Sequence, residues 1–248
     1  MDVAVITVGD ELLAGETENT NATWLADRLT SRGASVRRII VLPDDRAVLA
    51  AHIQQYSEEM DATIVTGGIG STPDDVTMEA VAAAFDRPLV LDELALEAVR
   101  ARLATLERQI PELELDIDEQ AEASIPEGSR PLLNEEGLAP GCVLETVYVL
   151  PGIPGEMRAM FESVAEEFSG ESVSEHLYSV EPESHLVPAL RECGHRFDVS
   201  VGCYPDRDAR YNRLKVSGTD PDEVTLAAQW LLGAVDGSKT PVERDWVG

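Results

Sequence analysis

The sequence predicts an α/β fold with a mostly parallel sheet covered by helices on both faces, followed by a small α+β module. Two observations predict it. Short apolar runs, of the length of buried strands, alternate with amphipathic helical stretches in the first half of the chain. Such alternation is typical of parallel sheets with right-handed crossovers. A Ser-Gly pair at positions 169–170 marks a boundary, beyond which the order of strands and helices changes.

The first three strand–helix units follow one another closely. Their strands are expected at residues 3–8, 35–42 and 62–65, and their helices at residues 22–29, 46–57 and 78–85. The rest of the domain is expected to contain a long amphipathic helix, a short strand, an irregular loop, a strand pair and a helix, at residues 93–109, 123–125, 132–141, 142–150 and from 154 onward. Residues 111–122 are acidic and weakly periodic, and whether they continue the long helix stays open.

The C-terminal part reads as strand, helix, two strands and helix, at residues 173–180, 183–193, 197–203, 211–216 and 221–235. The expected hairpin turn between the last two strands lies at residues 206–209. We therefore expect a first domain over residues 1–170, a small α+β module over 171–236 and a tail over 237–248.

Charge is the most unusual feature of the composition. The 248 residues include 47 Asp and Glu against 19 Lys and Arg, a formal net charge of −28. Such a surface repels nucleic acids and anionic membranes, so neither is expected as a partner. The acids are spread along the chain, which favours a soluble protein of a halophilic source. We expect a cytoplasmic protein, because no leader and no apolar run of membrane-spanning length is evident and the three cysteines form no metal or disulfide framework.

The sequence is organised around residues 65–77, which read VTGGIGSTPDDVT. This loop follows a buried strand and opens a helix, so Gly67, Gly68 and Gly70 lie at the carboxyl end of the strand. Glycines let the backbone approach a ligand closely, and Ser71 and Thr72 add hydroxyl groups. Successive N–H groups beside a helix N-terminus form a site for an anion such as a phosphate.

Asp74 and Asp75 place two carboxylates beside this loop. Carboxylates repel a phosphate unless a cation lies between them, which favours a divalent metal or acid–base chemistry. An ordinary turn with one of these residues as helix N-cap is the alternative. Other acidic turns follow the first and second strands, at residues 9–11 and 43–45, and all three turns are expected at one edge of the sheet.

Two further polar residues have open roles. Asn21 follows Asn19 and Thr20 at a helix start, where capping and ligand contact are equally consistent with the pattern. Glu156 lies in the first turn of the helix that follows the LPGIPG turn, where an acid is favourable without any ligand.

Several motifs occur together in a known order: GDELLAG, NTNATWLADRL, LPDD, TGGIGSTPDDVT, NEEGLAPG and LPGIPGEMRAMF. As a set they closely resemble the N-terminal domain of the competence/damage-inducible CinA family, related to the MogA, MoaB and gephyrin molybdopterin-binding domains. The resemblance covers about residues 3–168. The C-terminal module more weakly resembles the small KH-like domain of CinA-type proteins. The amidase domain of full CinA proteins is absent from this sequence.

The resemblance implies a three-layer α/β/α MogA-like domain that forms an oligomer, a dimer or trimer. It implies roles for the residues that match the family motifs: Asp10, Asn21, Asp45, Gly67, Gly68, Gly70, Thr72, Asp75, Asn134, Gly152 and Glu156. The chain departs from the MogA-type loop at Pro73-Asp74, where MogA-type loops tend to carry a basic residue before the acid.

Three functions follow as hypotheses. The first is metal-dependent hydrolysis of a nucleotide diphosphate, ADP-ribose to AMP and ribose 5-phosphate. The loop from Gly67 to Thr72 would then hold a phosphate. Asp75 with Asp45 or Asp10 would hold Mg²⁺, Mn²⁺ or Co²⁺, and Asp74 or Glu156 would act as base. The second is binding or adenylylation of molybdopterin, a pterin phosphate. The third is a non-enzymatic nucleotide-binding module.

Overall fold

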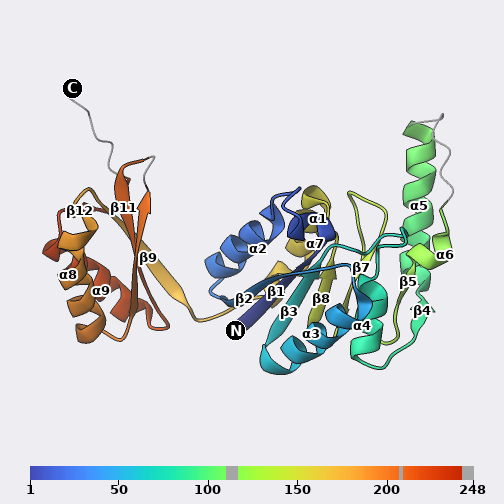
Figure 1. Ribbon diagram of the computed structural model, residues 1–248, viewed down its shortest axis with the longest axis horizontal. Helices are drawn as coiled ribbons and strands as arrows, with labels where there is room; N and C mark the ends of the chain where they lie inside the picture. Colours follow the sequence, from blue (N-terminus) through green and yellow to red (C-terminus); the bar gives the residue numbers. More distant parts are fainter. Residues whose placement is uncertain (110–116, 207–208, 242–248) are drawn as a thin grey trace. The chain divides into compact units, whose positions relative to one another are not determined.

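The computed structural model describes residues 1–109, 117–206 and 209–241. The chain divides into two compact units, Met1–Gly170 and Glu171–Gly248. Each unit has its own sheet (Figure 1). None of the helices in these described ranges is both long and apolar enough to cross a bilayer.

The first unit is built on a six-stranded sheet of order β2-β1-β3-β8-β7-β6. Three neighbouring pairs of strands are parallel, and the two pairs that contain β7 are antiparallel, so the predicted mostly parallel sheet is confirmed. The strands are β1 (Asp2–Val8), β2 (Ser35–Leu42), β3 (Ala62–Thr66), β6 (Arg130–Leu132), β7 (Gly141–Leu144) and β8 (Val147–Leu150).

Helices cover both faces of this sheet, as the predicted fold class requires (Figure 1). On one face, α2 (Thr20–Ser31) and α7 (Pro154–Val164) bury Leu25, Leu29 and Phe161 against β1 and β3. On the other face, α3 (Arg46–Glu59) and α4 (Thr77–Ala84) bury Leu49, Ile53 and Val81. Each of these helices has one apolar face, and burial of that face against the sheet stabilises the packing of the layers.

Smaller elements complete the unit. The strands β4 (Leu89–Leu91) and β5 (Ser124–Pro126) form a separate pair. Near them lie the long helix α5 (Glu93–Gln109) and the short α6 (Glu119–Glu122). A one-turn helix, α1 (Asp10–Leu13), follows β1, and the 3-10 helix η1 (Ala165–Glu167) follows α7. Of residues 111–122, for which a continuation of the long helix was left open, residues 111–116 lie outside the described residues, and the remainder contains the separate helix α6, capped by Asp118.

The second unit is a small α+β module, as predicted. Its order is β9 (Val173–Ser179), α8 (Glu183–Arg196), β10 (Ser200–Asp206), β11 (Tyr211–Gly218), α9 (Pro221–Ala234) and β12 (Gly237–Ser238). The antiparallel sheet has the order β10-β11-β9-β12. Its last strand pairs with β9 through Gly237 and Ser238, two residues that the sequence placed in a tail. Half of the predicted hairpin turn, at residues 207–208, lies outside the described residues.

Candidate functional site

Three loops meet at the carboxyl edge of the central strands β1, β3 and β8. Gly67, directly after β3, donates its N–H to the carbonyl of Leu150 at 3.1 Å. Its φ is 107°, and a Cβ there would lie 2.5 Å from the carbonyl oxygen of Val8. A Cβ on Gly152, after β8, would lie 3.2 Å from the Cα of Gly67. Glycine is required at position 67 because any side chain would meet the end of β1.

The loop between β3 and α4 leaves a run of backbone donors open. Thr77 donates its hydroxyl to the carbonyl of Gly67 at 2.7 Å and its N–H to the carbonyl of Gly68 at 2.9 Å. These bonds tie the carbonyl groups to the start of α4. In the described part of the chain, the N–H groups of residues 68–71 have no hydrogen-bond acceptor. Consecutive free donors of this kind form a binding site for an anion.

The second half of the loop is folded by its own carboxylates. The Thr72 hydroxyl lies 2.5 Å from Oδ2 of Asp75 and 2.6 Å from Oδ1 of Asp74. The N–H of Thr72 also donates to Asp75, at 3.1 Å. The hydrogen bond from Thr72 holds the pKa of Asp74 below its ordinary value. The two predicted catalytic acids therefore shape the loop in this structure.

A cavity of about 360 Å³ lies beside the open donors. Its walls combine apolar groups with three carboxylates, and they include Gly68, Ile69, Gly70, Asp75, Glu122, Leu138, Ala139, Gly152, Ile153 and Glu156. A volume of this size, mostly apolar with a few polar groups, is typical of sites for small molecules. A smaller hollow of about 150 Å³ lies beyond Glu122, where Ser71, Thr72 and Glu79 contribute.

Glu122, which no sequence motif indicated, also lines the cavity. Its side chain is only 8% exposed, and its Oε2 has no hydrogen-bond partner among the described residues. Burial raises the pKa of this carboxyl, a hydrogen bond from Ser71 opposes the rise, and the charge of Asp75 adds to it. An unpaired buried carboxylate oxygen is a strong acceptor for a ligand donor. No local signal distinguishes Glu122 within its acidic segment.

Asn134 and Glu156 form one structural unit at the far wall. The side-chain amide of Asn134 donates to Oε2 of Glu156 at 2.8 Å and to the carbonyl of Ala139 at 3.0 Å. Its Oδ1 accepts the N–H of Gly137 at 2.8 Å. Asn134 thus holds the 133–140 loop against Glu156, and it fixes where that carboxylate faces the cavity.

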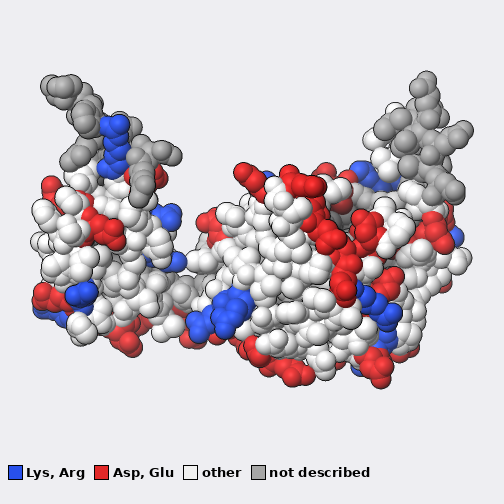
Figure 2. Space-filling view, viewed as in Figure 1, with Lys and Arg blue, Asp and Glu red and all other residues white. Residues whose placement is uncertain are grey.

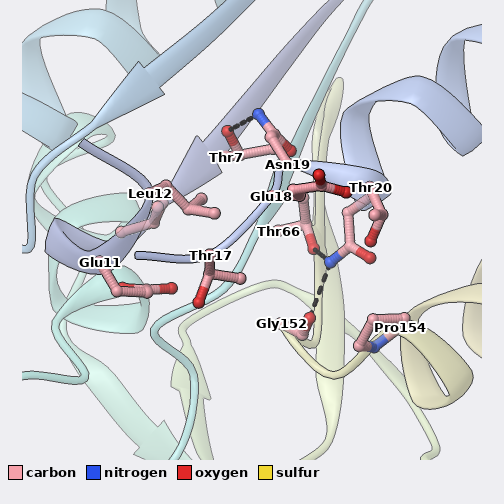
Figure 3. A pocket seen from close by; sticks show the side chains of 12 residues that line it. Thr7, Glu11, Leu12, Thr17, Glu18, Asn19, Thr20, Thr66, Gly152 and Pro154 are labelled. Atoms are coloured by element: carbon pink, nitrogen blue, oxygen red, sulfur yellow. Dashed lines mark hydrogen bonds between the residues drawn. The ribbon is translucent and has the colours of Figure 1, made fainter. Parts of the chain in front are cut away.

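Asn21 lines a neighbouring hollow of about 100 Å³ (Figure 3). Its amide donates to the carbonyl of Gly152 at 2.7 Å and lies 3.4 Å from the Thr66 hydroxyl. Its Oδ1 is buried and has no partner in the described ranges. The cap of α2 is instead Asn19, whose Oδ1 accepts the N–H of Ala22 at 3.2 Å. The question left open by the pattern is answered here, since Asn19 caps the helix and Asn21 faces the hollow.

Two of the predicted metal ligands have hydrogen bonds within their own loops. Asp45 caps α3, because its Oδ1 accepts the N–H groups of Ala47 at 2.9 Å and Val48 at 3.0 Å. Asp75 is held by Thr72, on a different loop. In the ranges that the structure describes, no group of three or more His, Cys, Asp or Glu side chains is placed to hold a metal ion. The expectation that Asp75 holds a metal ion together with Asp45 or Asp10 concerns a pair of carboxylates and stays a prediction.

Asp44, rather than Asp45, is the acid that faces the other loops. Its Oδ2 accepts the N–H of Asp10 at 2.9 Å. A Cβ on Gly68 would lie 3.6 Å from its Oδ1. Burial raises the pKa of Asp44, and the charges of Asp10, Glu11 and Asp74 raise it further, against the lowering effect of the Asp10 N–H.

Figure 2 shows Asp and Glu side chains gathered over the part of the first unit that carries α1 and α7 in Figure 1.

The comparisons with known proteins agree with this description. Residues 4–170 match the family described as "Probable molybdopterin binding domain", and residues 171–242 match "FAD synthase, middle domain". The second match describes the C-terminal module in different terms from the expected KH-like domain.

Similar proteins extend over nearly the whole chain. A protein of Archaeoglobus fulgidus is 36% identical over 231 residues, 92% of this chain and 96% of that protein. A protein of Thermococcus kodakarensis is also 36% identical, over 241 residues, 93% of this chain and 96% of its own length. None of these likenesses tests the expected adaptation to salt.

A solved structure supports the same assignment for the first unit. The protein CinA of Thermoplasma acidophilum, described as of unknown function, superposes with a TM-score of 0.58 at 34% identity. The match covers 67% of this chain and 97% of that one. The resemblance to the CinA N-terminal domain is thereby confirmed, and the chain belongs to the family of probable molybdopterin-binding domains.

Proposed function

We propose that the first unit binds a pterin phosphate of the molybdopterin type, with its phosphate on the loop between β3 and α4. One observation carries the proposal: the four consecutive N–H groups of residues 68–71 have no acceptor within the described residues, and they border a cavity of about 360 Å³. The match to a family of probable molybdopterin-binding domains supports the choice of a pterin over other phosphorylated ligands.

Two helix N-termini support a phosphate at this place. The N-cap residues of α4 and α7 are Val76 and Ile153, and neither provides a side-chain hydrogen bond to its helix. Thr77 already donates its N–H to Gly68, and Pro154 has no N–H. The next N–H groups of the two helices, at residues 78–79 and 155–156, have no acceptor among the described residues and carry partial positive charge. A phosphate beside Gly68 and Gly152 would be stabilised by both helix ends as well as by the loop.

The carboxylates of the cavity fit the other end of such a ligand. A pterin ring is flat and apolar on its faces, and its edge carries amino and ring N–H donors. The apolar walls at Ile69, Leu138 and Ile153 suit the ring faces. The unpaired Oε2 of Glu122 suits a ring donor, because a buried acceptor gains from any donor it meets. Donors for the phosphate and acceptors for the ring would thus lie at different walls of one cavity.

The proposal is tested by anaerobic titration of the protein with molybdopterin, followed by the pterin fluorescence. We expect saturable binding that weakens roughly tenfold in Glu122→Gln, since a hydrogen bond to a charged acceptor contributes about 1.5–3 kcal/mol. Glu119→Gln is the matched control, because Glu119 lies on the same short helix but pairs with Arg100 at 2.7 Å. Absence of binding by the folded wild-type protein, or equal weakening in both variants, would contradict the proposal.

Hydrolysis of ADP-ribose is a second candidate, favoured by one observation. The carboxylate of Asp44 lies beside Gly68, so an acid adjoins the loop that would hold the diphosphate. The test is release of AMP from ADP-ribose with Mg²⁺, Mn²⁺ or Co²⁺ added. AMP formed by the wild-type protein and lost in Asp75→Ala, together with failure to bind molybdopterin, would replace the first proposal by the second.

A further inference from the structure

The sheet of the C-terminal module has one covered and one open face. Leu177, Leu214 and Val216 point to one side, where they form a core with α8 and α9. Because side chains alternate along strands, the residues between them point to the other side. That open face carries Tyr178 of β9, Tyr204 of β10, and Tyr211 and Arg213 of β11.

Strand register brings these side chains into one group. Arg213 is paired with Tyr178 on one side and with Tyr204 on the other, so the three form a row across the sheet. The Cζ of Arg213 lies 5.5 Å from the centre of the Tyr204 ring. The rings of Tyr178 and Tyr211 meet edge to face, with centroids 5.2 Å apart. Three aromatic rings and a guanidinium group therefore surround one point of the face.

The group encloses a real hollow. A cavity of about 480 Å³ is lined by Tyr178, Tyr204, Pro205, Asp206, Tyr211 and Arg213. Tyr204 is 49% exposed, which is high for a large aromatic side chain. Its ring lies over Gly202, where a Cβ would come within 2.8 Å of the ring. The glycine therefore gives the ring room to lie along the sheet rather than to stand up from it.

The face is locally basic in an acidic chain. The sequence contains only two lysines, and one of them, Lys215, follows Arg213 on the same face of β11. His176 is the register partner of Lys215 on β9. The pKa of His176 is lowered first by burial and then by the positive charges of Arg213 and Lys215, which places both cations near it. In a chain with a net charge of −28, two neighbouring cationic side chains on one face are unusual and favour an anionic ligand there.

We propose that this face binds a mononucleotide, with its base stacked on the tyrosine rings and its phosphate at Arg213 and Lys215. Stacking of a base on an aromatic side chain does not depend on which base it is, because each base has a flat face. An arginine held over a tyrosine is ordered in advance for a phosphate. Open antiparallel sheets with aromatic side chains on their central strands stack bases in this way in RNA-recognition modules.

Charge and size favour a single nucleotide over a nucleic acid strand. A polyanion that extended beyond the face would meet the acidic surface of the chain, whose 47 carboxylates repel phosphates. The cavity of about 480 Å³ is within the range for one small ligand. The carboxylate of Asp206 at its wall also disfavours a second phosphate there. The proposal is independent of the function proposed for the first unit.

The experiment is a calorimetric titration of the full chain with AMP, adenosine, ribose 5-phosphate and a short oligoadenylate. We expect AMP to bind with one site, and adenosine and ribose 5-phosphate to bind roughly tenfold more weakly, because each lacks one of the two contacts. Tyr204→Leu and Arg213→Gln should each weaken AMP roughly tenfold. Arg37→Gln is the matched control, since Arg37 is an exposed arginine on β2 that pairs with Asp2.

Four results would overturn the proposal. One is failure of the wild-type protein to bind AMP, and another is equal AMP affinity in the wild-type protein and both module variants. A third is loss of AMP binding in Ser71→Asp, which would place the nucleotide at the loop after β3. The fourth is an oligoadenylate that binds much more tightly than AMP, which would make the occupant a strand. Circular dichroism and thermal unfolding establish that Tyr204→Leu and Arg213→Gln remain folded, so that weakened binding counts for the proposal.

Discussion

Two neighbouring loops at the edge of the sheet differ in whether their backbone N–H groups have hydrogen-bond acceptors. The turn between β2 and α3 is closed, because Asp45 accepts two N–H groups of α3 and Asp44 accepts the N–H of Asp10. The loop between β3 and α4 is open, because the N–H groups of residues 68–71 lack acceptors among the described residues. Both loops follow parallel strands and begin helices, so topology does not cause the difference.

The free N–H groups of the open loop mark the place where this edge of the sheet can bind a ligand. Backbone donors in a folded protein are normally satisfied, and a set left open costs free energy unless water or a ligand supplies acceptors. In the closed turn, the chain supplies its own carboxylates as acceptors. In the open loop, the carboxylates of Asp74 and Asp75 are used by Thr72 instead, which keeps the donors at residues 68–71 available.

The largest expected effect comes from breaking the open loop at Gly67. Gly67→Ala would force a Cβ to 2.5 Å from the carbonyl of Val8 at a φ of 107°, so the loop or β1 must move. We expect the free energy of unfolding to fall by more than about 2 kcal/mol, measured by urea denaturation.

Gly128→Ala is the control for that experiment. Gly128 also has a positive φ, of 85°, but a Cβ there meets no atom within 4 Å. Its cost should stay at about 1 kcal/mol, the cost of the left-handed conformation alone. Equal destabilisation by the two substitutions would show that the contact of Gly67 with β1 is unimportant.

A second prediction separates the two loops by their acids. Asp45→Ala removes a helix cap, so we expect a loss of about 1 kcal/mol in stability and no change in molybdopterin affinity. Asp75→Ala removes the acceptor that folds the open loop, so we expect affinity to fall roughly tenfold, about 1.4 kcal/mol. Denaturation and fluorescence titration measure the two quantities. Tighter binding by Asp75→Ala would mean that its charge opposes the ligand more than its hydrogen bonds help.

The third prediction converts an open helix end into a closed one. Ile153 is the N-cap of α7 and is 62% exposed, so replacing it removes little packing. Ile153→Asp should cap the helix and raise stability by about 0.5–1 kcal/mol, while its carboxylate competes with a phosphate and weakens molybdopterin binding. Ile153→Asn is the neutral comparison, because it caps without adding charge. Both variants lose the apolar side chain that lines the cavity, so equal molybdopterin affinities of the aspartate and asparagine variants would exclude α7 from the phosphate site.

The smallest expected effect concerns the acid that faces the open loop. The folded-state pKa of Asp44 lies above the ordinary value of 3.8, so the folded protein binds more protons than the unfolded chain between those two pKa values. Ionisation of Asp44 therefore lowers stability as pH rises through that window. We expect the stability of Asp44→Asn, relative to the wild-type protein, to increase as the pH rises from about 4 through the folded-state pKa of Asp44.

Denaturation at several pH values measures this effect. Asp27→Asn, on the exposed side of α2, controls for the change in net charge. A relative stability of Asp44→Asn that stays constant or decreases over the same range would contradict the assigned environment of Asp44.

Local patterns in the sequence predicted the larger part of the fold. The strand–loop–helix order around Gly67 and the mostly parallel sheet follow from apolar runs and glycines that act within a few residues. The elements that were missed are short. β4, β6 and β12 have two or three residues each, and tertiary pairing rather than local propensity defines them.

The glycine loop at the centre of the site was predictable from the sequence, but the acidic residues around it were not. Gly67, Gly68 and Gly70 indicate that a ligand or another part of the chain can approach the loop backbone closely. Whether Asp45 or Asp44 faces that loop depends on which of two adjacent carboxylates caps α3, and sequence spacing does not distinguish them. Glu122 joins the cavity from a segment more than 50 residues away along the chain, so only the folded structure places it beside Ser71.

The N–H donors of residues 68–71 can be observed directly by NMR. In ¹H–¹⁵N spectra of the assigned protein, molybdopterin added under anaerobic conditions should shift the amide signals of residues 68–71 downfield, as expected when N–H groups gain a phosphate acceptor. The amides of Ala47 and Val48, already bonded to Asp45, should not move. Binding that leaves the four loop amides unshifted, or that shifts both sets equally, would contradict the claim that the open loop holds the phosphate.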